Sequence, residues 1–320
     1  MMNRSIDHRA GDAQQGLLGW RAFFRSYTFQ RTWEKVLVTF FFLNGFFAVV
    51  VLLGIFSLLF IEGVPAFKTI SLKEFFFSSV WNPTSPVQER YGILSLVIST
   101  MMTTVGALFI AAPLGVACAA YLSDVASAKV REVVKPAVEI LAGIPSVVVG
   151  FLGLVVVAPL LARLFSLPNG LNALNGSILL AVMSLPTIIS LSEDALVAVP
   201  QEYKSASLAL GANRWQTLVR VTIPSALSGI IASIMLGMGR AIGETMTVLM
   251  ACGNSQAMPH SFLDSVRTMT ATIAIELGET AYGSPHYHSL FIIGFVLFLM
   301  TFLVNLVSDL ILARYQEVAR

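Results

Sequence analysis

Long uninterrupted runs of apolar residues dominate the chain, and polar positions gather between them. Six runs without a charged residue cover positions 36–61, 91–123, 140–162, 164–192, 221–239 and 280–308. About 20 apolar residues span the hydrocarbon core of a bilayer as a helix, and every run meets or nearly meets that length. A seventh run, 245–263, follows the fifth after only Arg240 and Glu244. We therefore interpret 225–252 as one helix carrying both charges, and the pattern predicts an all-α membrane protein with six transmembrane helices.

The predicted helices divide the chain into segments. We expect helices at about 36–61, 92–122, 136–163, 176–199, 225–252 and 289–312. The segments are a polar N-terminal arm (1–35), a first transmembrane helix (36–61), an outer loop (62–91), a five-helix core (92–312) containing the loop 201–224, and a tail (313–320). Proline lies inside or at the start of four helices, where it frees a carbonyl that neighbours or water must satisfy. This favours a bent bundle with an internal cavity, although packing irregularity is the alternative explanation for any single proline.

Composition and charge support a membrane protein. Hydrophobic residues make up 56% of the 320 residues and charged residues 12%, whereas soluble domains carry about a quarter charged residues. The net charge of +2 argues against a nucleic-acid partner. Fourteen Lys and Arg residues lie in the arm, the tail and the loops around 129–135 and 204–220, against five in the other loops. Because positive residues favour the cytoplasmic side, both termini should be cytoplasmic.

The segment 201–224, between the predicted fourth and fifth helices, has a regular pattern of its own. Pro200 ends the preceding helix, and Tyr203–Leu210 is a run of helix formers and small residues. Gly211 can adopt the positive φ that ends a helix, and Asn213 can cap the next helical piece. We predict a helix–turn–helix elbow on the cytoplasmic side, with Pro224 beginning the fifth helix. An ordinary connection is the alternative, but a loop of 24 residues this regular is unusual unless it has a role of its own.

This elbow resembles the cytoplasmic loop of import-type ABC transporter permeases. In that family a Glu-Ala-Ala element precedes a glycine by four residues, and Ile-x-Leu-Pro follows after nine more. Here Ser205-Ala206-Ser207 precedes Gly211, and Val221-Thr222-Ile223-Pro224 follows at the same spacing, with serine in place of the glutamate and of the second alanine. The resemblance implies a short coupling helix that sits in a groove of a separate ATPase subunit. The serines weaken only the inference of a particular ion pair there.

Three further stretches resemble one branch of this family. Residues 139–150 (Glu-Ile-Leu-Ala-Gly-Ile-Pro-Ser-Val-Val-Val-Gly), 81–83 (Trp-Asn-Pro) and 237–246 (Gly-Met-Gly-Arg-Ala-Ile-Gly-Glu-Thr-Met) are similar to PstC-type permease subunits of phosphate importers. The resemblance extends over about 75–310 and implies the type I ABC importer permease fold in a bacterial inner membrane. It implies these partners: a homologous permease, two cytoplasmic ATPase subunits holding ATP and Mg, and a periplasmic binding protein that delivers phosphate. A permease for sulfate or molybdate, a passive channel and an intramembrane enzyme are the alternatives.

Arg240 and Glu244 are the candidate residues of the substrate path. Four residues apart, they would share a helix face, and Gly239 and Gly243 would let a neighbouring backbone approach. A guanidinium offers paired donors suited to a tetrahedral oxyanion, and a carboxylate would partly cancel its charge so that the anion is not trapped. A charge near mid-bilayer costs roughly 2.5–3.5 kcal/mol on insertion scales. A self-neutralising structural pair is therefore the alternative.

Other charged residues are weaker candidates. Glu193 and Asp194 lie near the cytoplasmic end of the predicted fourth helix. They could cap the mouth of the channel or pair with Lys204, and a satisfied structural pair at an interface is the alternative. Glu276 and Glu279, in the second outer loop, could meet the binding protein.

We find no nucleotide-binding, metal-binding or catalytic motif in the sequence. It lacks Gly-x4-Gly-Lys-Ser/Thr, so we do not expect this chain to bind ATP itself. His286 and His288 have no further ligands near them in the pattern, so no metal site is predicted. We therefore expect no catalytic residue and no cofactor in this chain.

Overall fold

The computed structural model describes residues 4–318, and side chains over residues 34–310. The chain divides into two units, one ending at Leu58 and the other beginning at Leu59. The first unit consists of helix α1 (Arg4–Gly63) up to Leu58. Its described side chains are exposed and mostly apolar from Val36 onward, as expected of a helix that faces lipid. The predicted crossing 36–61 lies inside α1, which continues without a break into the predicted arm 1–35; residues 1–3 lie outside the description.

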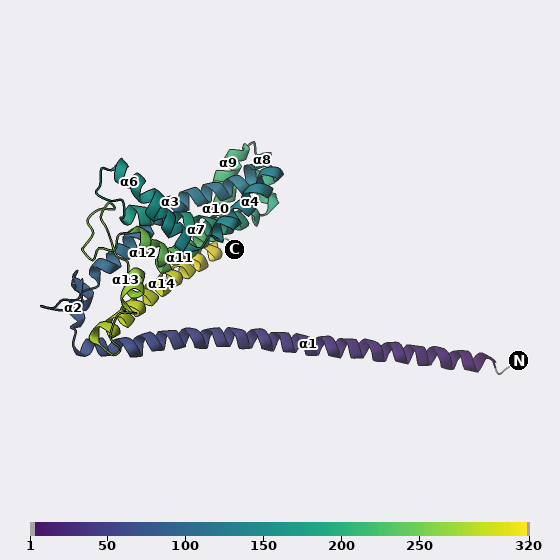
Figure 1. Ribbon diagram of the computed structural model, residues 1–320. Helices are drawn as coiled ribbons and strands as arrows, with labels where there is room; N and C mark the ends of the chain where they lie inside the picture. The colour runs from purple at the N-terminus through teal and green to yellow at the C-terminus, as the bar shows by residue number, and fades with distance from the viewer. Residues whose placement is uncertain (1–3, 319–320) are drawn as a thin grey trace. The chain divides into compact units, whose positions relative to one another are not determined.

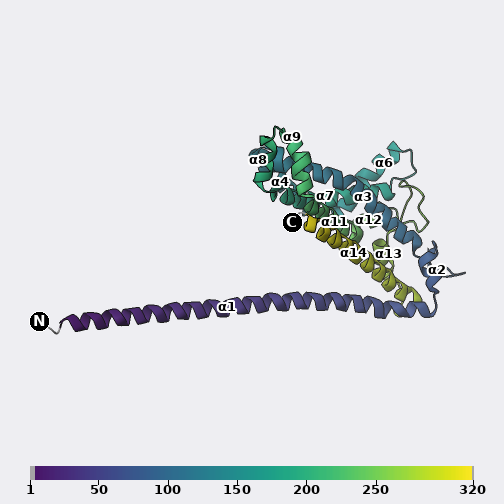
Figure 2. The ribbon, with the colours of Figure 1, turned by 180° about the vertical axis from the view of Figure 1, so that it is seen from behind.

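The second unit is a bundle of helices with one small hairpin (Figures 1 and 2). Its elements in chain order are η1 (Val64–Lys68), α2 (Leu72–Phe77), β1 (Trp81–Asn82), β2 (Arg90–Tyr91), α3 (Leu94–Ala120), η2 (Tyr121–Val125), α4 (Ala128–Ala142), α5 (Ser146–Leu152), η3 (Gly153–Val157), α6 (Ala158–Leu164), α7 (Ala173–Val197), α8 (Gln201–Ala209), α9 (Arg214–Thr217), η4 (Leu218–Thr222), α10 (Ile223–Ser225), α11 (Leu227–Gly243), α12 (Met246–Ala251), α13 (Met269–Glu276) and α14 (Pro285–Val318). In both views α8, α9 and the C-terminal end of α14 lie at one end of this unit, and α2 and α6 lie at the other.

The centre of the bundle is α7, which packs against α3 and α11, while α11 also packs against α14. Ile188 of α7 is fully buried between two glycines. A Cβ placed on Gly115 of α3 would lie 2.7 Å from Ile188 Cγ2, and one on Gly237 of α11 would lie 2.8 Å from Ile188 Cγ1. Small residues let membrane helices approach closely in this way.

Within the described residues of this chain, no neighbouring backbone makes the close approach that we predicted at Gly239 and Gly243. A Cβ on Gly243 would meet no described atom within 4 Å, and one on Gly239 would meet only Asn305 Oδ1, at 3.8 Å. The glycine of this helix that faces Ile188 is Gly237, two residues earlier, and Gly229 is also tightly packed, since a Cβ there would lie 2.4 Å from Ala195 Cβ.

The described part of the chain has five helices long and apolar enough to cross a membrane, and six if one bent pair counts as a single span. The five are Glu34–Lys68, Leu94–Val125, Ser146–Leu164, Ala173–Val197 and Pro285–Leu310. The bent pair is Arg214–Ser225 with Leu227–Gly243, which meet at 69°. Counting this pair as one span gives the six crossings predicted from the charge-free runs.

Two predicted helices are broken. The third, predicted over 136–163, ends at Ala142; Gly143–Pro145 interrupts it, and the crossing begins at Ser146. Proline disfavours the helical conformation of the residue before it and has no N–H to donate, so Pro145 ends α4 and starts a new helix. The fifth, predicted over 225–252, stops at Gly243, because Glu244 is extended (φ −69°, ψ 132°) and α12 begins at Met246.

At the end of the bundle away from α8 and α9, a charged cluster joins three segments. In α13, Glu276 Oε1 accepts from Arg267 Nη1 at 2.7 Å, while its Oε2 accepts from Trp81 Nε1 at 3.0 Å and lies 2.8 Å from His286 Nε2. Trp81 is buried and packs edge-on against Tyr91 in the hairpin. The cluster therefore holds the predicted loop 62–91, which contains short helical pieces as expected, against the loop 253–288.

Gly170 marks a tight point in the connection between α6 and α7. A Cβ there would lie 1.9 Å from the carbonyl oxygen of Ala158, a main-chain atom that cannot turn aside. We expect Gly170→Ala to destabilise the chain by about 2 kcal/mol or more, because overpacking against rigid neighbours is costly. The apparent midpoint of thermal unfolding in detergent should fall. Gly278→Ala is the matched control, since no described atom lies within 4 Å of its Cβ position; equal midpoints for the two variants would contradict this prediction.

Candidate functional site

The segment 201–224 folds as the predicted elbow. Helix α8 ends at Ala209, and Gly211 has the positive φ of 90° that glycine tolerates. Asn213 then opens α9: its Oδ1 accepts from Gln216 N at 2.8 Å, and Gln216 Oε1 accepts from Asn213 N at 2.9 Å. This reciprocal cap satisfies two free N–H groups at the start of the helix. The elbow is thus a defined unit built by its own local sequence.

The end of the elbow differs from the prediction. Pro224 does not begin the fifth helix, because Ile223 and Pro224 belong to the short helix α10. The chain bends at Ala226, and the long helix α11 starts only at Leu227. A proline at the first helical turn needs no N–H partner, so it is accommodated in α10 on the near side of the bend.

The surface of the elbow is apolar at its tip. Leu210 is 90% exposed and Trp215 is 69% exposed, and Ser205 and Ala206 also face away from the bundle surface. Ser207 points inward, where its Oγ lies 3.0 Å from Thr217 Oγ1 of α9. Large apolar side chains gathered on an exposed loop are typical of a docking surface.

Glu193 and Asp194 do not pair with Lys204 as we considered. Glu193 of α7 is 1% exposed and accepts hydrogen bonds from Arg131, whose Nε lies at 2.8 Å, while Lys135 Nζ lies 3.1 Å from its other oxygen. The hydrogen bond to Glu193 raises the pKa of Lys135. Asp194 is 3.7 Å from Lys135. These pairs tie the amphipathic helix α4, which has no buried residue, to the end of α7.

Arg240 lies in the last turn of α11, exposed at the surface of the chain. Its Nη1 donates to Thr187 Oγ1 at 3.4 Å, midway along α7. Glu244 Oε1 instead accepts from Thr247 N at 3.3 Å. Within residues 34–310, Arg240 forms no ion pair with Glu244 or with any other carboxylate. The prediction that both residues share one helix face is wrong, since α11 ends between them.

The two helix breaks lie next to each other. Thr247 Oγ1 of α12 donates to the carbonyl oxygen of Ser146, the first residue of α5, at 3.1 Å. Thr270 of α13 donates to the carbonyl oxygen of Glu244 at 2.9 Å and so satisfies the unwound backbone. Non-helical backbone at membrane depth is tolerated where protein or water covers it. Glu244 therefore borders a polar region where the two helix breaks meet, and Arg240 lies at the exposed surface one turn earlier.

Sequence reasoning missed the three threonines of this region, Thr187, Thr247 and Thr270. Hydroxyls inside apolar runs carry no charge and do not interrupt a hydropathy pattern. The signal that could have located the region was Gly143-Ile144-Pro145, since a Gly and a Pro so close together favour a break.

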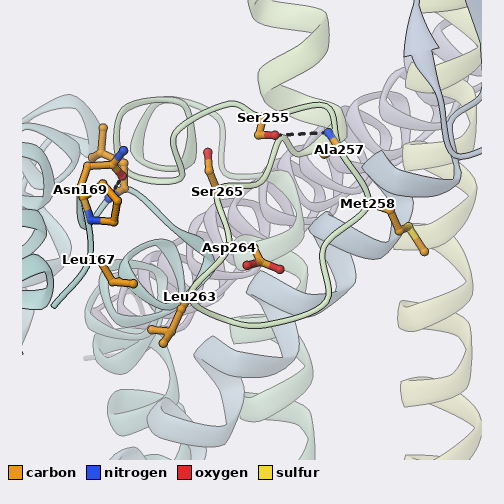
Figure 3. A pocket seen from close by; sticks show the side chains of 10 residues that line it. Leu167, Asn169, Ser255, Ala257, Met258, Leu263, Asp264 and Ser265 are labelled. Carbon is orange, nitrogen blue, oxygen red and sulfur yellow. Dashed lines mark hydrogen bonds between the residues drawn. The ribbon is translucent and has the colours of Figure 1, made fainter. Parts of the chain in front are cut away.

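A shallow pocket opens at the end of the bundle away from the elbow (Figure 3). Leu167 and Asn169 line one side, and Leu263, Asp264 and Ser265 line the other. The carboxylate of Asp264 accepts the N–H groups of His260 and Ser261, both at 2.8 Å, and these hydrogen bonds lower the pKa of Asp264. In the described residues, no group of three or more His, Cys, Asp or Glu side chains could hold a metal ion.

The sequence matches a known family of membrane proteins and several of its curated members. Residues 111–317 match the family described as binding-protein-dependent transport system inner membrane component. The chain is 39% identical over 256 residues to a probable ABC transporter permease protein, YqgH, of Bacillus subtilis, covering 79% of this chain and 82% of the relative. It is 36% identical over 259 residues to the phosphate transport system permease protein PstC of Mesorhizobium japonicum, covering 75% and 78%.

A solved structure has a similar fold over most of this chain. It is an inward-facing conformation of the MetNI methionine ABC transporter, in its native crystal form, with a TM-score of 0.54 at 19% identity, covering 70% of this chain and 97% of that chain. At this identity the likeness concerns the fold alone.

Proposed function

Because the chain belongs to the family of binding-protein-dependent transport system inner membrane components, we propose that it is a permease subunit of an ATP-driven phosphate importer. The substrate is assigned from the relatives that are named as phosphate transport system permeases and match most of this chain. As a permease subunit, it moves its substrate across the membrane and catalyses no chemical reaction.

The observation that carries this function is the guanidinium of Arg240, which has no ion-pair partner among the described residues. A charge within the membrane persists where a partner or water offsets its cost, and within the described residues only Thr187 contacts Arg240 through a hydrogen bond. A guanidinium presents paired donors to a tetrahedral oxyanion. Arg240 would contact the passing phosphate, and Glu244, held at the adjacent break, would keep the net charge of the path low enough for release.

The elbow is the proposed contact with the ATPase subunits. Its exposed tip supplies the apolar surface, with Ser205 and Ala206 on the outward side of α8. Gly211 sets the turn, and Ile223 and Pro224 lead into the bend toward α11. ATP and Mg would be held by the ATPase alone, and this chain would bind no cofactor.

The remaining partners are assigned from the family and from the surface of the chain. Its spans expose many apolar side chains and the charged Arg240, so a homologous permease would cover one face and complete the path. A periplasmic phosphate-binding protein would dock at the end away from the elbow. The location would be a bacterial inner membrane, with the elbow and both termini in the cytoplasm, as the distribution of Lys and Arg indicates. The C-terminal end of α14 lies at the same end as the elbow (Figure 1), which supports this orientation for the C-terminus.

Uptake of labelled phosphate by proteoliposomes containing the assembled complex tests the function. We expect uptake that requires ATP on the elbow side and that excess sulfate or molybdate leaves unchanged, because the path is assigned to phosphate. The control is the same complex with the ATPase subunits omitted, which should accumulate nothing. Uptake without ATP would indicate a passive channel, and inhibition by sulfate or molybdate would indicate another oxyanion as the substrate.

A further inference from the structure

Helix α8 is attached to the bundle through one narrow face. None of its residues is buried, and only Lys204 and Ser207 are half-buried, while its other residues are exposed. Residues three apart lie on the same side of a helix, so these two side chains form the face toward the protein. Any movement of α8 must reach the rest of the chain through this face or through the backbone of the elbow.

The two side chains have different partners. Ser207 contacts Thr217 at 3.0 Å, and this contact stays inside the elbow. Lys204 Nζ lies 2.7 Å from Asp124 Oδ1, and the side chains are 12% and 21% exposed. Within the described residues, this is the one hydrogen bond or ion pair that joins a side chain of α8 to a residue outside 201–224. Because it is mostly shielded from solvent, salt screens it less than a surface pair.

Asp124 lies between the end of α3 and the start of α4, so a displacement of Asp124 can be passed to both helices. It lies in η2, the π-helical turn that closes α3, and Ser123 Oγ holds its second oxygen at 3.1 Å. Helix α3 packs along α7, and α4 begins at Ala128, just beyond this turn, and is tied to α7 through Glu193. A π-helical turn is a local irregularity that often marks a functional position.

We propose that the Lys204–Asp124 ion pair is the link that transmits movement of the elbow to α3 and α4. This inference rests on the proposed role of the elbow as the contact with the ATPase. Lys204 and Asp124 are positioning residues: neither touches the substrate or the nucleotide, and their pairing makes α8 and the end of α3 move together.

The test measures phosphate transported per ATP hydrolysed in proteoliposomes containing the full complex. Asp124→Asn is expected to retain the ATPase subunits on purification and to lower this ratio roughly tenfold, within the range found for coupled ion pairs. The matched control is Glu132→Gln, an exposed carboxylate of α4 that forms no ion pair in the described residues, and its ratio should equal that of the unsubstituted complex. The charge swap Asp124→Lys with Lys204→Asp should recover most of the lost ratio.

Two outcomes would overturn the link: an unchanged ratio in Asp124→Asn, or a charge swap as defective as that single variant. If Asp124→Asn does not assemble, the charge swap alone decides, since recovery by the reversed pair requires the interaction itself. Failure of the proposed function would look different, because the unsubstituted complex would then retain no ATPase and accumulate no phosphate.

Discussion

Arg240→Gln is expected to reduce ATP-driven phosphate uptake by about 100-fold or more while the complex still assembles, since removing one partner of a desolvated charge-assisted contact costs about 2–5 kcal/mol. Glutamine is uncharged and shorter but still polar, so it keeps a hydrogen-bonding group at this position and has no charge to offer an anion. Labelled phosphate uptake in proteoliposomes gives the rate, and co-purification of the ATPase subunits reports assembly.

Two further variants are the controls for Arg240→Gln. Arg90→Gln removes an exposed guanidinium from strand β2, where its one side-chain hydrogen bond among the described residues goes to Gln88, and uptake should be unchanged. Arg240→Lys keeps the charge but loses the paired donors, so its uptake should lie between those of the unsubstituted protein and Arg240→Gln. Normal uptake by Arg240→Gln would end the assignment of Arg240 to the path.

Leu210→Asp is expected to remove the ATPase subunits from the purified complex and, with them, all uptake. Leu210 is 90% exposed at the tip of the elbow, so the substitution should leave the fold of this chain intact. Burying a leucine in a partner's groove contributes about 1.5–3 kcal/mol, and an aspartate there would add the cost of burying an unpaired charge. Retention of ATPase on an affinity-tagged permease measures the effect directly.

Val87→Asp is the matched control for that experiment. Val87 is 94% exposed in the connection between β1 and β2, so the same apolar-to-acidic change is made on a loop far from the elbow. It should retain the ATPase in full. If Leu210→Asp also retained it, the tip of the elbow would not be a docking surface. Loss of uptake with assembly intact in Arg240→Gln, against loss of both in Leu210→Asp, separates the path from the coupling contact.

The spans and the elbow could be predicted from the sequence because both depend on residues that are close together in the chain. A charge-free run of sufficient length is enough to predict a membrane crossing. The predicted fold class, an all-α membrane protein with the type I ABC importer permease fold, is confirmed. Gly211 and Asn213 act on their own backbone and near neighbours, so their roles could be predicted without any tertiary contact.

The breaks and the ion pairs could not be predicted in the same way. A hydropathy pattern reflects side chains and carries no information on main-chain conformation. The charge-free run 140–162 therefore gave no indication that the helix is interrupted before Ser146. At the break near Glu244, Gly243 was the one residue that could have indicated it. Ion pairs depend on segments brought together by folding. Lys204 lies near Glu193 in sequence, yet its partner is Asp124, 80 residues away. The roles of Arg240 and Glu244 in transport stay predictions.

The seating of Ile188 between Gly115 and Gly237 limits how the transporter can alternate its access. Sliding α7 along either neighbour would move the isoleucine side chain against helices that already lie too close at Gly115 and Gly237 for a Cβ to fit without a shift. Helices α3, α7 and α11 should consequently move together as one rigid body. A change between inward and outward openings would then require movement at its borders, where α4 is held to α7 by ion pairs and where two non-helical residues separate α11 from α12.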